Sequence, residues 1–370
     1  MRKLVVKIGS STLTDADGRA DYAYLARFAE QVSQVKEAGW QPIIVTSGAI
    51  ACGLETLHIA TRPSDMPSLQ AAASVGQSIL SGEYAAALAP YGILTGSVLL
   101  TRRDTADHTA YLHARDTFER LLELGVVPIV NENDTVSIEQ IRFGDNDTLA
   151  ALVACLVDAD LVIILSDIDG LYDANPREDA SAQLIDRVES ITPAIMASAG
   201  GTGSVVGSGG MVTKLKAARV LMSAGIPMVV CYGREDNVLP RIANGESVGT
   251  YFAPGASRHE ITPKKLWIAL GDSAKGSVTI DDGAVRALMR QGSSLLTVGV
   301  KAVDGRFDVD DIVDVKDSRG YIIARGKIAA SNDELALACG MDSNQLAENR
   351  VLAHLANRPL MHRDDLIVFD

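Results

Sequence analysis

The sequence has 370 residues, more than one hydrophobic core usually holds, so we expect two domains. Its 47% apolar and 22% charged residues are those of an ordinary globular protein, and no apolar run approaches the ~20 residues that a membrane-spanning helix needs. A formal net charge of −13 argues against general nucleic-acid binding, because a uniformly acidic surface repels phosphates.

The cysteines and histidines exclude two further classes. The four cysteines are widely separated without a Cys-x-x-Cys pair, and the six histidines include no His-Glu-x-x-His motif. This pattern argues against a disulfide framework or a zinc site and is typical of a reducing compartment. The first residues reach Lys7 too soon for a signal-peptide core. We therefore predict a cytoplasmic location.

Up to about residue 255, short aliphatic runs alternate with longer helical patterns. This alternation predicts an α/β domain with an open, mostly parallel sheet covered by helices on both faces. The expected strands are Leu4–Ile8, Pro42–Val45, Ile93–Leu100, Val126–Val130, Leu161–Leu165 and Pro227–Cys231, and the expected helices are 21–38, 68–89, 109–124, 147–157 and 211–224.

After about residue 260, short strand-like runs stand between turns rich in Gly and Asp. The expected strands are Ser277–Ile280, Ile312–Val315 and Tyr321–Ala324, with brief helices at 282–291 and 332–339. This pattern predicts a second, small and mostly β domain. We place the first domain at 1–257, a linker at 258–271, the second domain at 272–350 and a tail at 351–370.

Polar clusters follow four of the expected strands. They are Lys7-Ile8-Gly9-Ser10-Ser11, Thr46-Ser47-Gly48-Ala49, Asn131-Glu132-Asn133-Asp134 and Ser166-Asp167-Ile168-Asp169-Gly170. In a parallel sheet these carboxyl ends share one edge, which is where open α/β folds bind ligands. One such cluster alone would be an ordinary solvated turn, but four at one edge predict a binding site.

Glycines at these positions favour an anion as the ligand. Gly9 and Gly48 stand where the chain leaves a strand, and Gly207-Ser208-Gly209-Gly210 leads into an expected helix. Small residues let backbone N–H groups approach phosphate, and a helix N-terminus attracts it. The spacing excludes a Walker A loop, since Leu215 follows Lys214, and Gly201-Thr202-Gly203 lacks the third glycine of a dinucleotide fingerprint.

The segment Asp145-Asn146-Asp147 precedes an Ala/Leu-rich helix. One of these residues could simply cap the helix. Beside Asp134 and Asp167, the cluster could instead hold an ammonium group, Mg²⁺ or a lysine. Lys7 at the end of a buried strand calls for a counter-charge of this kind.

Taken together, these segments resemble the amino acid kinase family, and within it the enzymes that phosphorylate glutamate at the start of proline biosynthesis. The tail resembles a PUA domain, a small pseudo-barrel, at Gly283-Ala284, Gly292–Leu296, Gly299-Val300 and Gly326. The other matching segments are Val5–Ser11, Val45–Ile50, Ala73–Gln77, Leu99–Arg102, Ala114–Thr117, Asn131–Asp134, Gly144–Asp147, Gly170–Tyr172 and Gly209–Lys214. Ser166 stands where the family usually has threonine, which keeps the hydroxyl.

The resemblance implies ATP-dependent phosphorylation of the γ-carboxylate of L-glutamate, with Mg²⁺ bound through ATP rather than by protein ligands alone. Lys7 and Lys214 would neutralise the transferring phosphoryl group, and Asp147 would hold both lysines. Glutamate would contact Ser47, Asp134 and Asn146. The expected ATP-binding residues are Lys7, Gly9, Ser10, Ser166, Asp167, Ser208, Gly209, Gly210, Met211, Val212, Thr213 and Lys214, with Gly48 as a further backbone donor.

Partners also follow from the resemblance. It implies feedback inhibition by proline, a homo-oligomer (dimer or tetramer), and cooperation with glutamate-5-semialdehyde dehydrogenase, the glutamyl phosphate reductase that consumes the product. The alternatives are an acetylglutamate or aspartate kinase of the same fold, an RNA-binding protein that uses the PUA-like domain, and an inactive amino-acid sensor. Residues 272–350 carry 13 acidic and 10 basic side chains, a net charge of −3, without the basic stripe expected of an RNA-binding surface.

Overall fold

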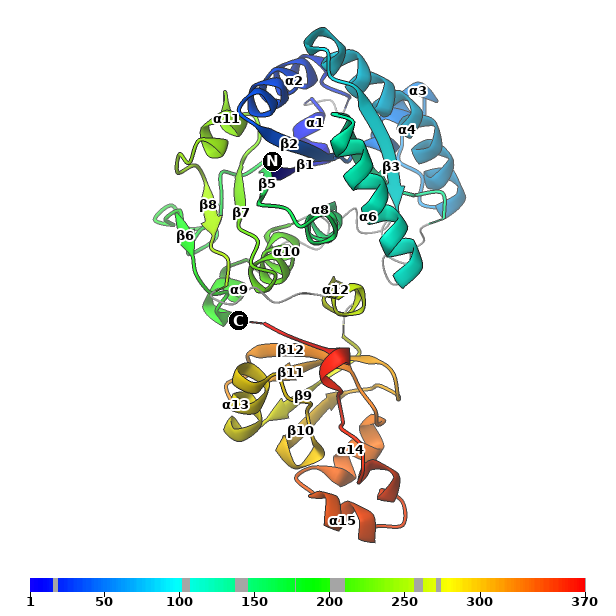
Figure 1. Cartoon of the computed structure of the whole chain (residues 1–370), viewed down its shortest axis with the longest axis vertical. Helices are drawn as coiled ribbons and strands as arrows, with labels where there is room; N and C mark the ends of the chain where they lie inside the picture. Colours follow the sequence, from blue (N-terminus) through cyan, green and yellow to red (C-terminus); the bar gives the residue numbers. More distant parts are fainter. Residues whose placement is uncertain are drawn as a thin grey trace. The chain divides into compact units, whose positions relative to one another are not determined.

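The structure, a computed structural model, describes residues 1–15, 19–101, 107–136, 146–176, 178–199, 210–255, 262–270 and 274–369. The chain divides into two compact units, Met1–His259 and Glu260–Asp370 (Figure 1). Among the described residues, no helix combines the length and the apolar character that crossing a membrane would need.

The first unit is built on one sheet whose strands run in the order β3-β4-β2-β1-β5-β7-β8-β6. The pairs from β3 to β7 are all parallel, and β7 pairs antiparallel with β8. The prediction of a mostly parallel sheet is therefore confirmed. The strands are β1 (Arg2–Ile8), β2 (Trp40–Val45), β3 (Thr95–Leu100), β4 (Val127–Glu132), β5 (Leu161–Ser166), β6 (Arg187–Val188), β7 (Met228–Tyr232) and β8 (Thr250–Phe252).

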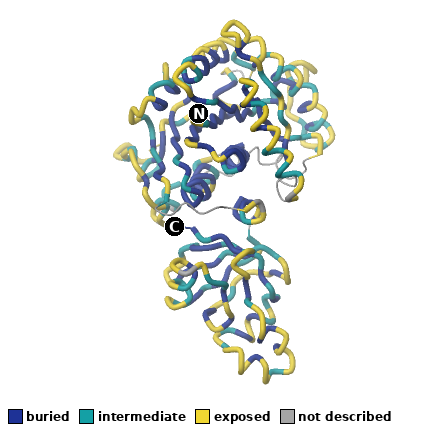
Figure 2. The backbone as a smooth tube through the Cα atoms, in the orientation of Figure 1, coloured by how far each residue is buried: buried dark blue, intermediate teal, exposed yellow. Residues whose placement is uncertain are grey.

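Helices cover both faces of this sheet. One face packs against α2 (Tyr22–Glu37), α4 (Met66–Leu88) and α11 (Val238–Ala243), and the other against α8 (Asn146–Val157) and α10 (Met211–Ser223) (Figure 1). The remaining helices are α1 (Ser10–Leu13), α3 (Ala49–Thr56), η1 (Ala89–Tyr91), α6 (His108–Glu123) and α9 (Pro193–Ala199). Helix α8 is buried almost all round, as its apolar sequence requires (Figure 2).

Strand alternation decides which β1 side chains meet which helix layer. Leu4, Val6 and Ile8 join the core under α2, α4 and α11. Successive side chains of a strand point to opposite faces, so Val5 and Lys7 face the α8 and α10 layer. The buried end of β1 thus delivers a lysine to the two helices that carry the other charged groups of the site.

The second unit has a five-stranded sheet in the order β10-β9-β11-β12-β13, in which only β9 and β11 pair in parallel. Its strands are β9 (Gly276–Ile280), β10 (Val300–Gly305), β11 (Ile312–Lys316), β12 (Ile322–Lys327) and β13 (Leu366–Val368). Its helices are α12 (Pro263–Leu270), α13 (Asp282–Gln291), η2 (Thr297–Gly299), α14 (Asn332–Ala338), α15 (Ser343–Glu348), η3 (Ala353–Leu355) and η4 (Arg363–Asp365).

Two segments of this unit carry more structure than the sequence indicates. The segment expected as a linker, 258–271, contributes α12, which contacts β12 and β13. The segment expected as a tail, 351–370, contributes β13 at the edge of the sheet. The second unit has the small sheet that the sequence predicts, with α12, β10 and β13 as elements that it does not predict.

Candidate functional site

The four polar clusters meet at one edge of the first sheet, as predicted. Strands β4, β2, β1 and β5 are successive neighbours and parallel, so their carboxyl ends lie side by side. The helices α8 and α10 pack against each other over one face. The site is assembled from these strand ends and the first turns of the two helices.

A buried carboxylate joins two buried lysines at this edge. Asp147, in the first turn of α8, is fully buried, with its Oδ1 2.7 Å from Lys7 Nζ and its Oδ2 3.1 Å from Lys214 Nζ. Thr213 Oγ1 donates to the same Oδ2 at 2.8 Å. Residues from β1, α8 and α10, 207 positions apart in the chain, thus form a single cluster.

The charges of this cluster favour an anionic ligand. Burial by itself would raise the pKa of Asp147, but the Lys7 and Lys214 ammonium groups outweigh it and hold that pKa at about 2. Two ammonium groups thus converge on one carboxylate, and the two lysine side chains are only 4–7% exposed. An anionic phosphoryl group at the sheet edge would be attracted to this pair of lysines.

The turns around the cluster offer backbone donors of unequal quality. Gly48 has φ of 98° at the N-terminus of α3, a conformation that favours glycine. Gly210 begins α10 without a side-chain cap, so the first amides of that helix remain suited to an anion. The Gly9 N–H lies 3.4 Å from Leu165 O, a long bond, and its role as a donor to an anion stays a prediction, as does that of Ser10.

Several predicted nucleotide contacts occupy the same edge. Ser10 opens α1, and Met211, Val212 and Thr213 form the first turn of α10. Ser166 ends β5 and donates from its Oγ to Asp167 Oδ1 at 3.1 Å. Ser208, Gly209 and Asp145 lie outside the described residues.

A chain of side-chain amides lies under the predicted glutamate contacts. Asn146 Nδ2 donates to Thr46 O and, at 2.9 Å, to Asn131 Oδ1. The N–H of Glu132 also donates to Asn131 Oδ1 at 2.9 Å, and Asn131 Nδ2 donates to Gln77 Oε1 at 2.8 Å.

Backbone groups fix the direction of every amide in this chain. The carbonyl of Thr46 can only accept, so Asn146 must present its nitrogen there, and the N–H of Glu132 can only donate, so Asn131 must present its oxygen. Asn146 is therefore left with Oδ1 as an acceptor for a further donor, such as an ammonium group. Sequence reasoning missed Gln77, although it ends one of the family segments quoted above.

The predicted glutamate contacts share one environment. Asn146 bonds to the residue that precedes Ser47, and to Asn131, three positions before Asp134. Asp134 is half-buried, and burial raises its pKa to about 6, against a smaller lowering by Arg62. A carboxylate in this state gains from pairing with a cation.

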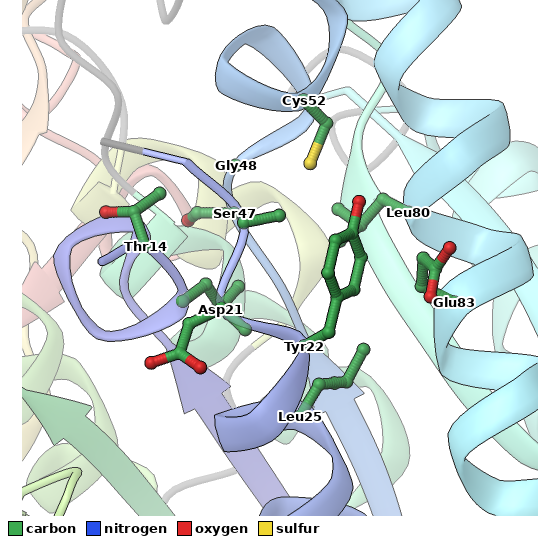
Figure 3. Close-up of a pocket in the computed structure, with 11 residues that line it drawn as sticks. Thr14, Asp21, Tyr22, Leu25, Ser47, Gly48, Cys52, Leu80 and Glu83 are labelled. Atoms are coloured by element: carbon green, nitrogen blue, oxygen red, sulfur yellow. The ribbon is translucent and has the colours of Figure 1, made fainter. Parts of the chain in front are cut away.

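A small cavity adjoins Ser47 and Gly48 (Figure 3). Its other walls come from the end of α1, the start of α2 and the chain between them, and from α3 and α4. The sequence did not predict these walls. The lining residues are Leu13, Thr14, Ala20, Asp21, Tyr22, Leu25, Ser47, Gly48, Cys52, Leu80 and Glu83.

Comparison with known proteins identifies the family of each part of the chain. Residues 2–232 match the profile of the amino acid kinase family, and residues 276–348 match that of the PUA domain. Among solved structures, the UMP kinase of Ureaplasma parvum overlaps 68% of this chain and 98% of its own with a TM-score of 0.48 at 14% identity, too low a similarity to support a conclusion.

Curated relatives match along nearly the whole length. The glutamate 5-kinase of Caldanaerobacter subterraneus subsp. tengcongensis is 41% identical over 368 residues, covering 100% of this chain and 98% of its own. That of Carboxydothermus hydrogenoformans is 44% identical with the same coverages, and that of Bordetella pertussis is 45% identical, covering 99% and 96%. The chain belongs to the amino acid kinase family, and the relatives that match it from end to end are glutamate 5-kinases.

Proposed function

We propose that this chain transfers the γ-phosphoryl group of ATP to the γ-carboxylate of L-glutamate, giving L-glutamyl 5-phosphate and ADP, the first step of proline biosynthesis from glutamate. The observation that carries the proposal is the buried Lys7–Asp147–Lys214 cluster at the carboxyl edge of the sheet. The end-to-end similarity to glutamate 5-kinases supports the choice of substrate.

The chemistry needs no general base. A γ-carboxylate has a reference pKa of ~4.3 and is ionised at neutral pH. One of its oxygens forms the new bond to the γ-phosphorus while the bond to the β,γ-bridging oxygen breaks, and ADP leaves with that electron pair. The obstacle is the approach of one anion to another, so catalysis rests on positioning and charge neutralisation.

The residues divide this work among them. Lys7 and Lys214 neutralise charge on the transferring group, and Asp147 keeps both ammonium groups at the same point. Ser10, Gly48 and the first turn of α10 supply backbone donors, and Ser166 and Asp167 contact the nucleotide. Ser208 and Gly209 remain proposed nucleotide contacts on the strength of the sequence.

We propose that the protein recognises glutamate by its α-ammonium group. Asp134 pairs with the ammonium group, the fixed Oδ1 of Asn146 accepts from it, and Ser47 donates to the substrate. An acetylated amine could not make the ion pair, which separates this substrate from N-acetylglutamate.

The proposed reaction also involves a metal ion, an inhibitor and partner proteins. We assign Mg²⁺ to the substrate as the ion carried by the ATP phosphates; within the described residues, no three His, Cys, Asp or Glu side chains are grouped to hold a metal. We also propose feedback inhibition by proline, assembly into a homo-oligomer, and hand-over of the labile product to glutamyl phosphate reductase, all by similarity. The four free cysteines support a reducing, cytoplasmic compartment.

The test is an acceptor panel. Purified protein with Mg²⁺ and ATP is incubated with hydroxylamine and glutamate, N-acetylglutamate or aspartate, and the hydroxamate formed from the acyl phosphate is measured. We expect hydroxamate with glutamate alone. Product with another acceptor would overturn the substrate, and no product with any acceptor, from folded protein that binds ATP, would overturn the activity.

A further inference from the structure

An arginine at the same sheet edge makes contacts that the proposed chemistry does not use. Arg234 stands two positions after β7, next in the sheet to β5. Its Nη1 donates to Asp21 Oδ2 at 2.7 Å, and its Nη2 donates to Thr14 O at 2.6 Å and Thr12 O at 3.0 Å. The planar guanidinium thus closes on one carboxylate and two backbone carbonyls more than 210 positions away.

The residue before it tightens the same junction. Gly233 donates from its N–H to Ser166 O at 2.8 Å and accepts from Tyr24 Oη at 2.9 Å. A Cβ at Gly233 would lie 2.7 Å from Thr12 Cγ2 and 2.9 Å from Leu165 Cβ, so only glycine allows this approach. The end of β7 is therefore tied to the end of β5 on one side and, on the other, to the described residues 12–15 and 19–24, called the Thr12–Tyr24 segment below.

That segment is continuous with the turn at the end of β1. Thr14 N donates to Ser10 O at 3.0 Å, and Asp21 N donates to Leu13 O at 2.8 Å. Asp21 divides its two oxygens, since Oδ1 caps α2 by accepting from Tyr24 N at 2.9 Å while Oδ2 accepts from Arg234. A displacement of this segment would move Ser10, a proposed phosphate donor.

The same segment forms a wall across from the substrate contacts. Thr14 and Asp21 line the cavity that Ser47 and Gly48 line from the end of β2 (Figure 3). One guanidinium therefore holds a stretch of chain with a phosphate-binding turn at one end and a wall beside the glutamate contacts along its length.

We propose that Arg234 is a positioning residue for phosphoryl transfer, which locks the Thr12–Tyr24 segment to the nucleotide-side strands and so places Ser10 and the wall opposite Ser47. The inference rests on the proposed function for its chemical consequence. The junction itself is a property of the fold and can be tested without it.

The contacts at this position require an arginine side chain. Three acceptors lie around one planar group, and a lysine ammonium, a single point of charge, cannot match that fork. The Arg234 and Asp21 side chains are 27% and 18% exposed, so loss of the guanidinium leaves partly buried acceptors without a partner. Arg234→Lys should accordingly recover only part of the function lost in Arg234→Ala.

The matched control is Arg241. It is likewise a multiply bonded, partly buried arginine, paired with the carboxylates of Glu235 and Glu246, and it lies seven positions further along the chain. No hydrogen bond or ion pair joins it to the described residues of the Thr12–Tyr24 segment. Arg241→Ala should leave turnover and both Michaelis constants within about twofold of wild type, because Glu235 and Glu246 lie outside the proposed site.

The experiment compares Arg234→Ala, Arg234→Lys and Arg241→Ala. We expect Arg234→Ala to lower kcat by about 10–100-fold, as misplacement by about 1 Å can do, and to raise KM for glutamate more than KM for ATP. Millimolar guanidinium should restore part of the activity of Arg234→Ala. It should not increase the activity of the wild-type protein. Backbone amide exchange should accelerate in Thr12–Asp15 and Arg19–Tyr24.

The possible outcomes distinguish a positioning role of Arg234 from a purely structural one. A lower melting temperature with unchanged kcat and KM values would reduce Arg234 to a structural role and overturn the inference. Should Arg234→Ala not fold, Asp21→Asn, which keeps the Oδ1 cap and weakens the bond to Arg234, must show the same kinetic pattern in milder form. Unchanged amide exchange in a folded Arg234→Ala variant would overturn the junction, whatever the activity of the wild-type protein. Absence of hydroxamate from the wild-type protein would instead reject the proposed function.

Discussion

Replacement of Asp147 by asparagine tests the charge balance of the site most sharply. The change keeps the shape of the side chain and removes the only carboxylate recorded against Lys7 and Lys214 within the described residues. The Asp147 side chain is completely buried, with 0% of it accessible to solvent. The variant would take this carboxylate away from two buried ammonium groups.

The magnitude follows from the pKa and from the burial. A fall from 3.8 to about 2 corresponds to about 2 kcal/mol of stability at 1.36 kcal/mol per pKa unit. Because the folded-state pKa is the lower one, this contribution is present above about pH 4 and is lost as the pH falls through about 2. Because the same carboxylate pairs with both buried lysines, the loss at pH 7 should be larger, about 3–5 kcal/mol.

Thermal unfolding of the first unit is the assay, because a chain of two units does not unfold in one step. A loss of about 3–5 kcal/mol should lower the melting temperature by roughly 6–20 °C. Sulfate or ADP should raise the melting temperature of Asp147→Asn more than that of wild type, because an anion replaces the missing charge. Asp116→Asn, which breaks an exposed ion pair with Arg115, is the control and should change stability by less than about 0.5 kcal/mol.

A melting temperature for Asp147→Asn within about 2 °C of wild type, with no added response to anions, would refute this reasoning. It would mean that the two lysines do not depend on the carboxylate. The cluster would then not be the charge-balanced anion site described above.

Three further predictions follow from the same geometry. Lys7→Ala and Lys214→Ala should each lower kcat by roughly 10²–10³, while Lys216→Ala, on the exposed side of α10, should not; full activity in both folded variants would remove the lysines from the mechanism. KM for glutamate should rise as the pH falls below about 6, because Asp134 then loses the charge that pairs with the ammonium group, and Asp134→Asn should abolish this dependence; a flat KM in wild type would argue against the pair. Gly76→Ala should destabilise the chain by at least about 1–3 kcal/mol, since its Cβ would lie 1.8 Å from Ala49 O, whereas Gly82→Ala on the same helix, with no atom within 4 Å, should stabilise it by up to about 1 kcal/mol; equal unfolding midpoints would contradict the close crossing of α3 and α4.

The sheet edge could be predicted because the ends of buried strands can be recognised in the sequence. Near-continuous aliphatic runs indicate buried parallel strands, and polar residues directly after them can only lie at the carboxyl edge. Lys7 is informative for the same reason, since a lysine in a buried strand needs a counter-charge. Strand β10 was missed because most of its side chains are exposed and show no alternation.

Contacts distant in sequence could not be read in this way. The Gln77–Asn131 bond joins a helix face to a strand end across 54 positions, and Arg234 reaches Asp21 across 213. Nothing in the neighbourhood of either residue marks its partner. The bond of 3.4 Å from Gly9 N to Leu165 O, on the neighbouring strand β5, is another such contact, and the role of the Gly9 N–H toward phosphate stays a prediction.

The most direct test of the central claim follows the oxygen that the carboxylate contributes. Glutamate labelled with ¹⁸O at both γ-carboxylate oxygens is incubated with the protein and Mg-ATP, and the phosphate released when the product cyclises is analysed by ³¹P NMR. If a carboxylate oxygen attacks the γ-phosphorus, each phosphate released carries one ¹⁸O atom. Phosphate without label would show that water, not glutamate, accepts the phosphoryl group, and would contradict the account.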